Sequence, residues 1–272
     1  MRAKRSLGQN FLVDPNLQRK IVEAVAIEPG DTVVEIGPGR GALTEHLAAA
    51  APALVAVELD PDLAERLQER FRHTPSVRIV HADVLEWDPG EILAHPPVRV
   101  VGNIPYNITS PILFRLLEWR PRPESMVVMV QTEVADRLRA DPGEKAYGAL
   151  TVGVRAAADV EKLFDVGRQA FRPVPNVDSA VVRIRPGATH RQVPEPVLRS
   201  LTRAAFGMRR KQLQKILRTA PGYGLEADRA EAVLREVGVS PRSRPETLAP
   251  DTFVELAAAL RRLGYPGAGE DT

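Results

Sequence analysis

The chain has 272 residues, of which 44% are hydrophobic and 26% charged, and its formal net charge is only +2. This apolar content is enough for a packed core and argues against a disordered chain. No apolar run approaches the ~20 residues of a membrane-spanning helix, the first residues lack the apolar stretch of a signal peptide, and cysteine is absent. We therefore expect a cytoplasmic protein without membrane segments, disulfides or thiol chemistry.

Short apolar runs alternate with helical patterns over the first two-thirds of the chain, which is typical of a parallel α/β sheet. The predicted strands span residues 32–36, 54–59, 77–80, 98–101, 126–130, 160–164 and 178–185. The predicted helices span residues 42–50, 61–72, 110–119, 132–140 and 148–158. Asp60 followed by Pro61 is a typical helix start. We expect an α/β fold with helices on both faces of the sheet.

The break at Pro186-Gly187 and the proline-spaced segment up to Pro196 predict a domain boundary. Beyond this boundary only helical patterns occur, over residues 196–206, 209–219, 226–237 and 250–263. The sequence thus predicts an α/β domain, residues 1–187, followed by a small all-α domain, residues 188–272.

The small net charge hides an uneven distribution. Residues 1–20 carry a net charge of +4 and residues 199–218 a net charge of +7, so the rest of the chain carries −9. The basic residues that we single out are Arg2, Lys4, Arg5, Arg209, Arg210, Lys211 and Lys215. Two basic segments on an otherwise acidic chain indicate a polyanionic partner, and nucleic acid is the usual one.

A glycine-rich turn separates the first predicted strand from the following helix. Gly37 and Gly39 in this turn allow a ligand to approach the backbone closely, although a dinucleotide-binding turn has a similar pattern. Glu58 ends the second strand, where a carboxylate can accept from both hydroxyls of a ribose. Asp83 follows the third strand and could accept from an adenine amine. These positions predict a nucleoside pocket at the carboxyl ends of three successive strands.

The fourth strand leads into Asn103, Ile104, Pro105 and Tyr106. Pro105 restricts its own φ and holds Ile104 in an extended conformation, so the Ile104 carbonyl has a fixed direction. The Asn103 side chain supplies a second acceptor, and Tyr106 supplies an aromatic face. Two acceptors and a stacking ring suit an exocyclic amine on a purine, although a proline turn with a buried tyrosine would have the same sequence.

Together, Glu35–Gly41, Glu58, Asp83 and Asn103–Tyr106 resemble the class I S-adenosylmethionine-dependent adenine methyltransferases, whose sheet is Rossmann-like. Three flanking segments, residues 4–12, 171–180 and 205–211, narrow this resemblance to the bacterial small-subunit ribosomal RNA adenine dimethyltransferases, the KsgA family. The similarity extends over nearly the whole chain. The motif has isoleucine at position 104 where many relatives have leucine, which changes little because only the main chain of this residue is implicated.

The resemblance implies a monomeric rRNA adenine N6-dimethyltransferase that uses S-adenosylmethionine to methylate two adjacent adenosines near the 3′ end of 16S rRNA, in the small ribosomal subunit, late in assembly. It implies cofactor contacts from Asn10, Leu12, Gly37, Gly39, Glu58, Asp83 and Asn103. It places the target base between Tyr106 and Phe171, with the Asn103 side chain and the Ile104 carbonyl at the amine of the base. The first domain would then bind the cofactor, and the basic segments and the helical domain would contact RNA.

Two other functions fit part of the pattern. An erythromycin-resistance type of methyltransferase would act on large-subunit rRNA, and the basic segment and helical tail argue against it. A catalytically silent RNA-binding factor would not need the intact Asn103, Tyr106, Glu58 and glycine turn. The five histidines lack metal-ligand spacing, so we expect no metal site.

Overall fold

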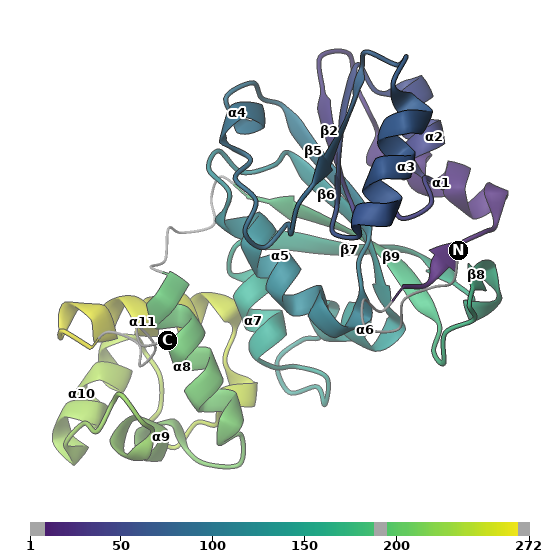
Figure 1. Ribbon diagram of the computed structural model, residues 1–272. Helices are drawn as coiled ribbons and strands as arrows, with labels where there is room; N and C mark the ends of the chain where they lie inside the picture. Colours follow the sequence, from purple (N-terminus) through teal and green to yellow (C-terminus); the bar gives the residue numbers. More distant parts are fainter. Residues whose placement is uncertain (1–8, 188–194, 266–272) are drawn as a thin grey trace. The chain divides into compact units, whose positions relative to one another are not determined.

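A computed structural model describes residues 9–187 and 195–265 (Figure 1). The chain forms two compact units. Unit 1 comprises residues 1–135 and 159–186, and unit 2 comprises residues 136–158 and 187–272. The break after Pro186 lies at the predicted boundary, but residues 136–158 group with the helical unit, which a single cut in the sequence does not anticipate. No helix of the described part of the chain is long and apolar enough to cross a membrane.

Unit 1 is built on a seven-stranded sheet in the order β4-β3-β2-β5-β6-β9-β7. Its strands are β2 (Thr32–Ile36), β3 (Ala53–Glu58), β4 (Val77–His81), β5 (Val98–Asn103), β6 (Ser125–Gln131), β7 (Ala158–Val166) and β9 (Ser179–Pro186). Strands β2 to β6 pair in parallel, whereas β9 is antiparallel to β6. The predicted α/β fold is confirmed, and each predicted strand is present.

Consecutive residues of the central strands, such as Val33 and Val34 or Val127 and Val128, are all buried, so both faces of the sheet are covered. The helices of unit 1 are α1 (Pro15–Val25), α2 (Thr44–Ala50), α3 (Pro61–Phe71), α4 (Gly90–Leu93) and α5 (Thr109–Glu118), and α6 (Thr132–Arg139) continues into unit 2. Helices α1 and α2 share one apolar cluster with β2, β5 and β6.

The sequence also contains a helix start that we did not predict. Asp14 caps α1 by accepting hydrogen bonds from the N–H groups of Asn16 and Leu17, at 2.8 and 3.1 Å, and Pro15 occupies the first turn. This is the same Asp-Pro signal that begins α3, where Asp60 is the cap. Before α1, β1 (Phe11–Leu12) pairs antiparallel with β8 (Phe171–Arg172). This pairing joins the start of the described chain to a segment about 160 residues later and has no local sequence signal.

Unit 2 consists of helices packed around their own apolar cluster. Its helices are α7 (Ala149–Arg155), α8 (Glu195–Gly207), α9 (Leu213–Thr219), α10 (Ala227–Glu236) and α11 (Pro250–Arg262). Tyr147 and Phe253 are fully buried in this cluster, and the Tyr147 hydroxyl donates a 2.6 Å hydrogen bond to the carbonyl of Leu248. The segment 136–158 therefore supplies part of the core of unit 2.

The basic residues at positions 209–211 lie in a turn, so the prediction of a helix over 209–219 was wrong at its start. The N–H of Lys211 donates to the carbonyl of Met208 at 2.8 Å, and Gln212 is extended, with φ −71° and ψ 148°. This extended residue separates the turn from α9, which begins at Leu213. The net positive charge is divided between α8, the turn and α9.

Candidate functional site

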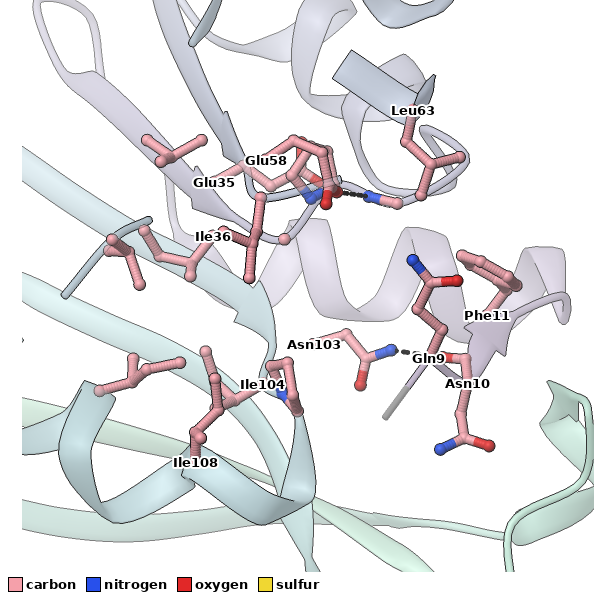
Figure 2. Close-up of a pocket in the computed structure, with 18 of the residues that line it drawn as sticks. Gln9, Asn10, Phe11, Glu35, Ile36, Glu58, Leu63, Asn103, Ile104 and Ile108 are labelled. Atoms are coloured by element: carbon pink, nitrogen blue, oxygen red, sulfur yellow. Dashed lines mark hydrogen bonds between the residues drawn. The ribbon is translucent and has the colours of Figure 1, made fainter. Parts of the chain in front are cut away.

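A pocket of about 310 Å³ opens in unit 1 at the carboxyl ends of the parallel strands (Figure 2). It lies where β2 separates β3 from β5, which is the switch point at which open α/β sheets bind ligands. The predicted residues that line it are Asn10, Leu12, Gly37, Gly39, Glu58, Asp83, Asn103, Ile104, Pro105 and Tyr106. The fold thus brings together side chains that are up to 96 positions apart in the sequence.

The glycine turn adopts a conformation that only glycine accommodates easily. Gly37 and Gly39 have φ values of +65° and +60°. A Cβ atom on Gly39 would lie 3.2 Å from the ring of Phe11, which packs over the turn. The N–H of Gly37 donates to the carbonyl of Val57 at 2.9 Å, so the turn is fixed to β3.

Glu58 closes the pocket on the side of β3. Its carboxylate accepts hydrogen bonds from the N–H groups of Gly39 and Asp60, both at 2.8 Å. Burial raises the pKa of the Glu58 carboxyl above its usual value, and these two N–H groups work against that rise by stabilising the anion. Asp83 similarly accepts a 2.9 Å hydrogen bond from the N–H of Leu85.

Glu35 is a pocket residue to which the sequence alone assigned no separate role. Its side chain is 1% exposed, and its Oε2 atom has no hydrogen-bond partner among the described residues. Burial raises the pKa of the Glu35 carboxyl to about 8, the Thr44 side chain works against that rise, and the charge of Glu58 adds to it. A buried carboxyl with one oxygen unpartnered among the described residues, beside a glycine turn, fits a cationic ligand, because a positive charge would stabilise the ionised form.

Asn103 ends β5 and has a fixed side-chain orientation. Its Nδ2 atom donates a 2.8 Å hydrogen bond to the backbone carbonyl of Asn10 (Figure 2). Only the amide nitrogen can donate to a carbonyl, so this contact distinguishes Nδ2 from Oδ1. The Oδ1 atom therefore remains as an acceptor. The neighbouring Gln9 donates to Asp60 at 2.9 Å, which holds the N-terminal segment against the mouth of the pocket.

The residues after Asn103 are held equally firmly. Ile104 is fully buried, and its N–H donates to the carbonyl of Met129 at 3.1 Å. Pro105 has φ −56° and ψ 130° and begins the 3-10 helix Tyr106–Ile108. The hydroxyl of Tyr106 forms a 2.6 Å hydrogen bond with the hydroxyl of Ser179. The direction of the Ile104 carbonyl is thus set by its neighbours on both sides.

Gly102 leads into this stretch, and the close packing of β5 against β2 requires glycine there. A Cβ atom at this position would lie 2.6 Å from the backbone carbonyl oxygen of Ile36. We expect Gly102→Ala to lower the free energy of unfolding by about 2–4 kcal/mol, because the two strands must separate to admit the methyl group. Urea unfolding measures this loss. Gly167→Ala is the control, because no side chain or backbone of the described residues beyond its chain neighbours lies within 4 Å of a Cβ atom at Gly167. Equal stability of both variants would contradict the prediction.

Phe171 does not line the pocket. Its ring is fully buried in the apolar cluster that contains Leu12, and β8 pairs Phe171 with Leu12. A side chain buried in this way presents no accessible face to a base. Of the two aromatic residues predicted to hold the base, Tyr106 is therefore the one that lines the pocket.

The predicted RNA-binding residues divide into three groups. Arg210, Lys211 and Lys215 are exposed on unit 2. The Arg209 guanidinium instead donates to the carbonyls of Glu144 and Lys145, both at 2.9 Å, and lies 3.7 Å from the Glu246 carboxylate. These contacts give Arg209 a structural role within unit 2. Arg2, Lys4 and Arg5 lie outside the described residues.

Comparisons with known proteins agree with this site. The family model for ribosomal RNA adenine dimethylase matches residues 1–260. The chain belongs to the ribosomal RNA adenine dimethylase family. It is therefore a methyltransferase that dimethylates adenine in ribosomal RNA with S-adenosylmethionine as the methyl donor, which confirms the resemblance and the cofactor predicted from the sequence.

Individual relatives support membership in this family. A protein of Geobacter metallireducens is 43% identical over 97% of this chain and 98% of its own length, and one of Prosthecochloris aestuarii is 51% identical over 79% of this chain and 81% of its own. Both are named ribosomal RNA small subunit methyltransferase A. A crystal structure of a dimethyladenosine transferase from Plasmodium falciparum has a TM-score of 0.81 at 25% identity, covering 94% of this chain and 99% of that one.

A second solved structure belongs to an enzyme named for a different rRNA. The 23S rRNA methyltransferase ErmE has a TM-score of 0.67 at 32% identity and covers 93% of this chain and 100% of that chain. The fold is therefore shared with an enzyme named for 23S rRNA, and the fold alone does not determine which ribosomal RNA is the substrate.

Proposed function

We propose that this family member dimethylates two adjacent adenosines near the 3′ end of 16S rRNA in the small ribosomal subunit, late in assembly, as a cytoplasmic monomer. This choice of rRNA rests on the sequence similarity, over 97% of the chain, to a relative named for the small subunit. ErmE, which is named for 23S rRNA, is less similar in sequence, at 32% identity compared with 43%.

The pocket residues suit S-adenosylmethionine. Glu58 and Asp83 supply acceptors at the ends of two strands, the glycine turn allows close approach, and the buried Glu35 carboxyl suits a positive charge. When bound, the cofactor supplies an electrophilic methyl group on a sulfonium. Asn10 and Leu12 would close the pocket from the N-terminal segment.

Asn103 and Ile104 would prepare the target amine. The lone pair of an adenine amine is delocalised into the ring, which makes the amine a poor nucleophile. Acceptance of its two N–H groups by Asn103 Oδ1 and the Ile104 carbonyl favours the pyramidal geometry in which this lone pair becomes available. The hydrogen bond from Asn103 to Asn10 supports this role, because it fixes the amide with Oδ1 left to accept. Tyr106 would stack on the extruded base and offset part of the cost of unstacking.

The choice of rRNA can be tested directly. Wild-type protein is incubated with labelled S-adenosylmethionine and with unmethylated small subunits, naked 16S rRNA or large subunits. We expect label on two adjacent adenosines of the small subunit, located by primer extension. Label on the large subunit alone would overturn the proposal.

The exposed basic residues of unit 2 would contact phosphates. We expect replacement of Arg210, Lys211 and Lys215 with alanine to weaken binding to the small subunit and to reduce the slope of log K against log salt by about 2–3. Measuring the dissociation constant over a range of potassium concentrations checks this. Arg66, Arg72 and Arg78, which are exposed on unit 1, provide a control that removes the same charge. An unchanged slope in the unit 2 variant, or an equal change in both, would contradict the assignment.

A further inference from the structure

The hydrogen bond between Tyr106 and Ser179 joins the pocket to β9, the strand that pairs antiparallel with β6. The two hydroxyl oxygens are 2.6 Å apart and belong to residues 73 positions apart in the sequence. Ser179 is fully buried, and burial raises the pKa of the Tyr106 hydroxyl above its usual value. The hydroxyl is therefore protonated at neutral pH and available for a hydrogen bond with Ser179.

The direction of β9 explains why Ser179 reaches the site. Strand β5 runs parallel to β6, with Asn103 opposite Met129, whereas β9 runs antiparallel, with Ser179 opposite Gln131. The first residue of β9 therefore lies at the same edge of the sheet as the last residue of β5. The chain just before Ser179 is fixed as well, since Asp178 accepts from the N–H of Arg168 at 2.9 Å and its carbonyl accepts from the N–H of Thr132 at 3.1 Å.

A contact at the phenol oxygen controls the position of the whole ring. Rotation about the Cα–Cβ bond moves the hydroxyl oxygen further than any atom of the ring. A hydrogen bond that holds this oxygen therefore also fixes the Cα–Cβ torsion. A hydrogen bond to a phenol also favours a partner close to the ring plane, which opposes rotation about the Cβ–Cγ bond. A single buried partner thus sets both the place and the tilt of the aromatic face.

We propose that Ser179 is a positioning residue for methyl transfer, which holds the Tyr106 ring at the angle at which the target adenine stacks. This inference rests on the role of Tyr106 in the proposed function. Ser179 itself does not line the pocket, so we expect it to contact neither the base nor the cofactor. Ser179 acts through the Tyr106 ring. Its loss should therefore lower kcat/KM for RNA and leave the affinity for the cofactor unchanged.

The test is a double-mutant cycle of Ser179→Ala and Tyr106→Phe, which each remove one of the two hydroxyl groups and keep the ring. Methyl transfer is measured at saturating S-adenosylmethionine with varied RNA substrate. We expect each single variant to lose about two- to twelvefold in kcat/KM for RNA, the factor that a hydrogen bond typically contributes. The double variant should lose no more than Tyr106→Phe alone. The Kd for S-adenosylhomocysteine should stay within about twofold of the wild-type value.

A matched control separates positioning from loss of a buried serine in general. Ser125 is also buried and begins a strand of the same sheet, but β6 runs opposite to β9, so Ser125 lies at the other edge. Ser125→Ala should leave kcat/KM for RNA unchanged, and thermal unfolding confirms that every variant is folded at the assay temperature. Wild-type kcat/KM in Ser179→Ala would overturn the inference. Fully additive losses, or a parallel loss of S-adenosylhomocysteine binding, would overturn it too.

Tyr106→Ala distinguishes failure of this inference from failure of the proposed function. If Tyr106→Ala is inactive while Ser179→Ala is unaffected, the ring is needed but Ser179 does not position it. If Tyr106→Ala retains wild-type kcat/KM, the ring does not bind the base, and the role that the proposed function gives to Tyr106 is wrong.

Discussion

Replacing Asn103 with alanine is expected to reduce methyl transfer by about 10²- to 10³-fold, as is typical when one preorganised hydrogen-bonding group is removed from a reacting centre. The variant loses the Oδ1 acceptor that we assign to the target amine. It also loses the 2.8 Å hydrogen bond to Asn10, so the N-terminal segment becomes less firmly held. We expect the affinity for S-adenosylmethionine to fall by no more than about tenfold, because Glu58, Asp83 and the glycine turn are unchanged.

Single-turnover transfer of labelled methyl groups and calorimetric binding of the cofactor measure these two effects separately. Asn16→Ala is a matched control, because Asn16 is exposed in the first turn of α1, and its side chain accepts a hydrogen bond from Arg19. It should behave as wild type in both measurements. Turnover of Asn103→Ala near the wild-type rate would refute the role in activating the amine.

The second large effect concerns Glu35 and pH. The pKa of its carboxyl is about 8 in the folded protein and 4.5 in the unfolded chain, so the folded state retains a proton that the unfolded state releases between these values. The stability of the ligand-free protein should therefore fall as pH rises from about 4.5 to about 8 and then stay constant with respect to this group. Glu35→Gln removes this pH-dependent loss of stability and should raise the free energy of unfolding by on the order of 3 kcal/mol at pH 7.

The same substitution should weaken cofactor binding. A neutral amide cannot attract a cationic ligand as a carboxylate does, and we expect the affinity for S-adenosylmethionine to fall by about tenfold or more. Wild-type protein should also release protons when the cofactor binds below pH 8, which calorimetry in buffers of different ionisation enthalpy detects.

Urea unfolding at pH 5 and pH 8 tests the stability change, with Glu65→Gln as a control at an exposed position of α3. The control should have the same pH dependence as wild type. If Glu35→Gln has that dependence too, the carboxyl of Glu35 is not the group that retains the proton.

Local patterns predicted the parts of the molecule that depend on neighbouring residues. The strands were predictable because buried parallel strands are continuous apolar runs. Glu58 and Asn103 both line the pocket because each ends such a strand. The Asp-Pro start of α1 is a local signal of the same kind as the start of α3.

Other features depend on contacts between distant residues, and the sequence does not encode them locally. The burial of Phe171 follows from its pairing with Leu12. The Oε2 atom of Glu35 has no hydrogen-bond partner among the described residues because of the packing around it. Arg209 was predicted to contact RNA because it belongs to a basic run. Its structural contacts are with Glu144 and Lys145, which lie 65 and 64 positions earlier in the chain. The contact of Ser179 with Tyr106 likewise appears only when β9 is placed antiparallel in the sheet.

The membership of residues 136–158 in unit 2 determines how the protein can be dissected. A fragment that ends at residue 187 would retain Tyr147 and Val152, which are completely buried only because helices from beyond that point surround them. Such a fragment would carry an uncovered apolar surface and should aggregate. An isolated catalytic unit therefore needs a short polar linker in place of residues 136–158 as well as removal of everything after Pro186. An isolated helical unit would have to be expressed with the 136–158 segment joined to it.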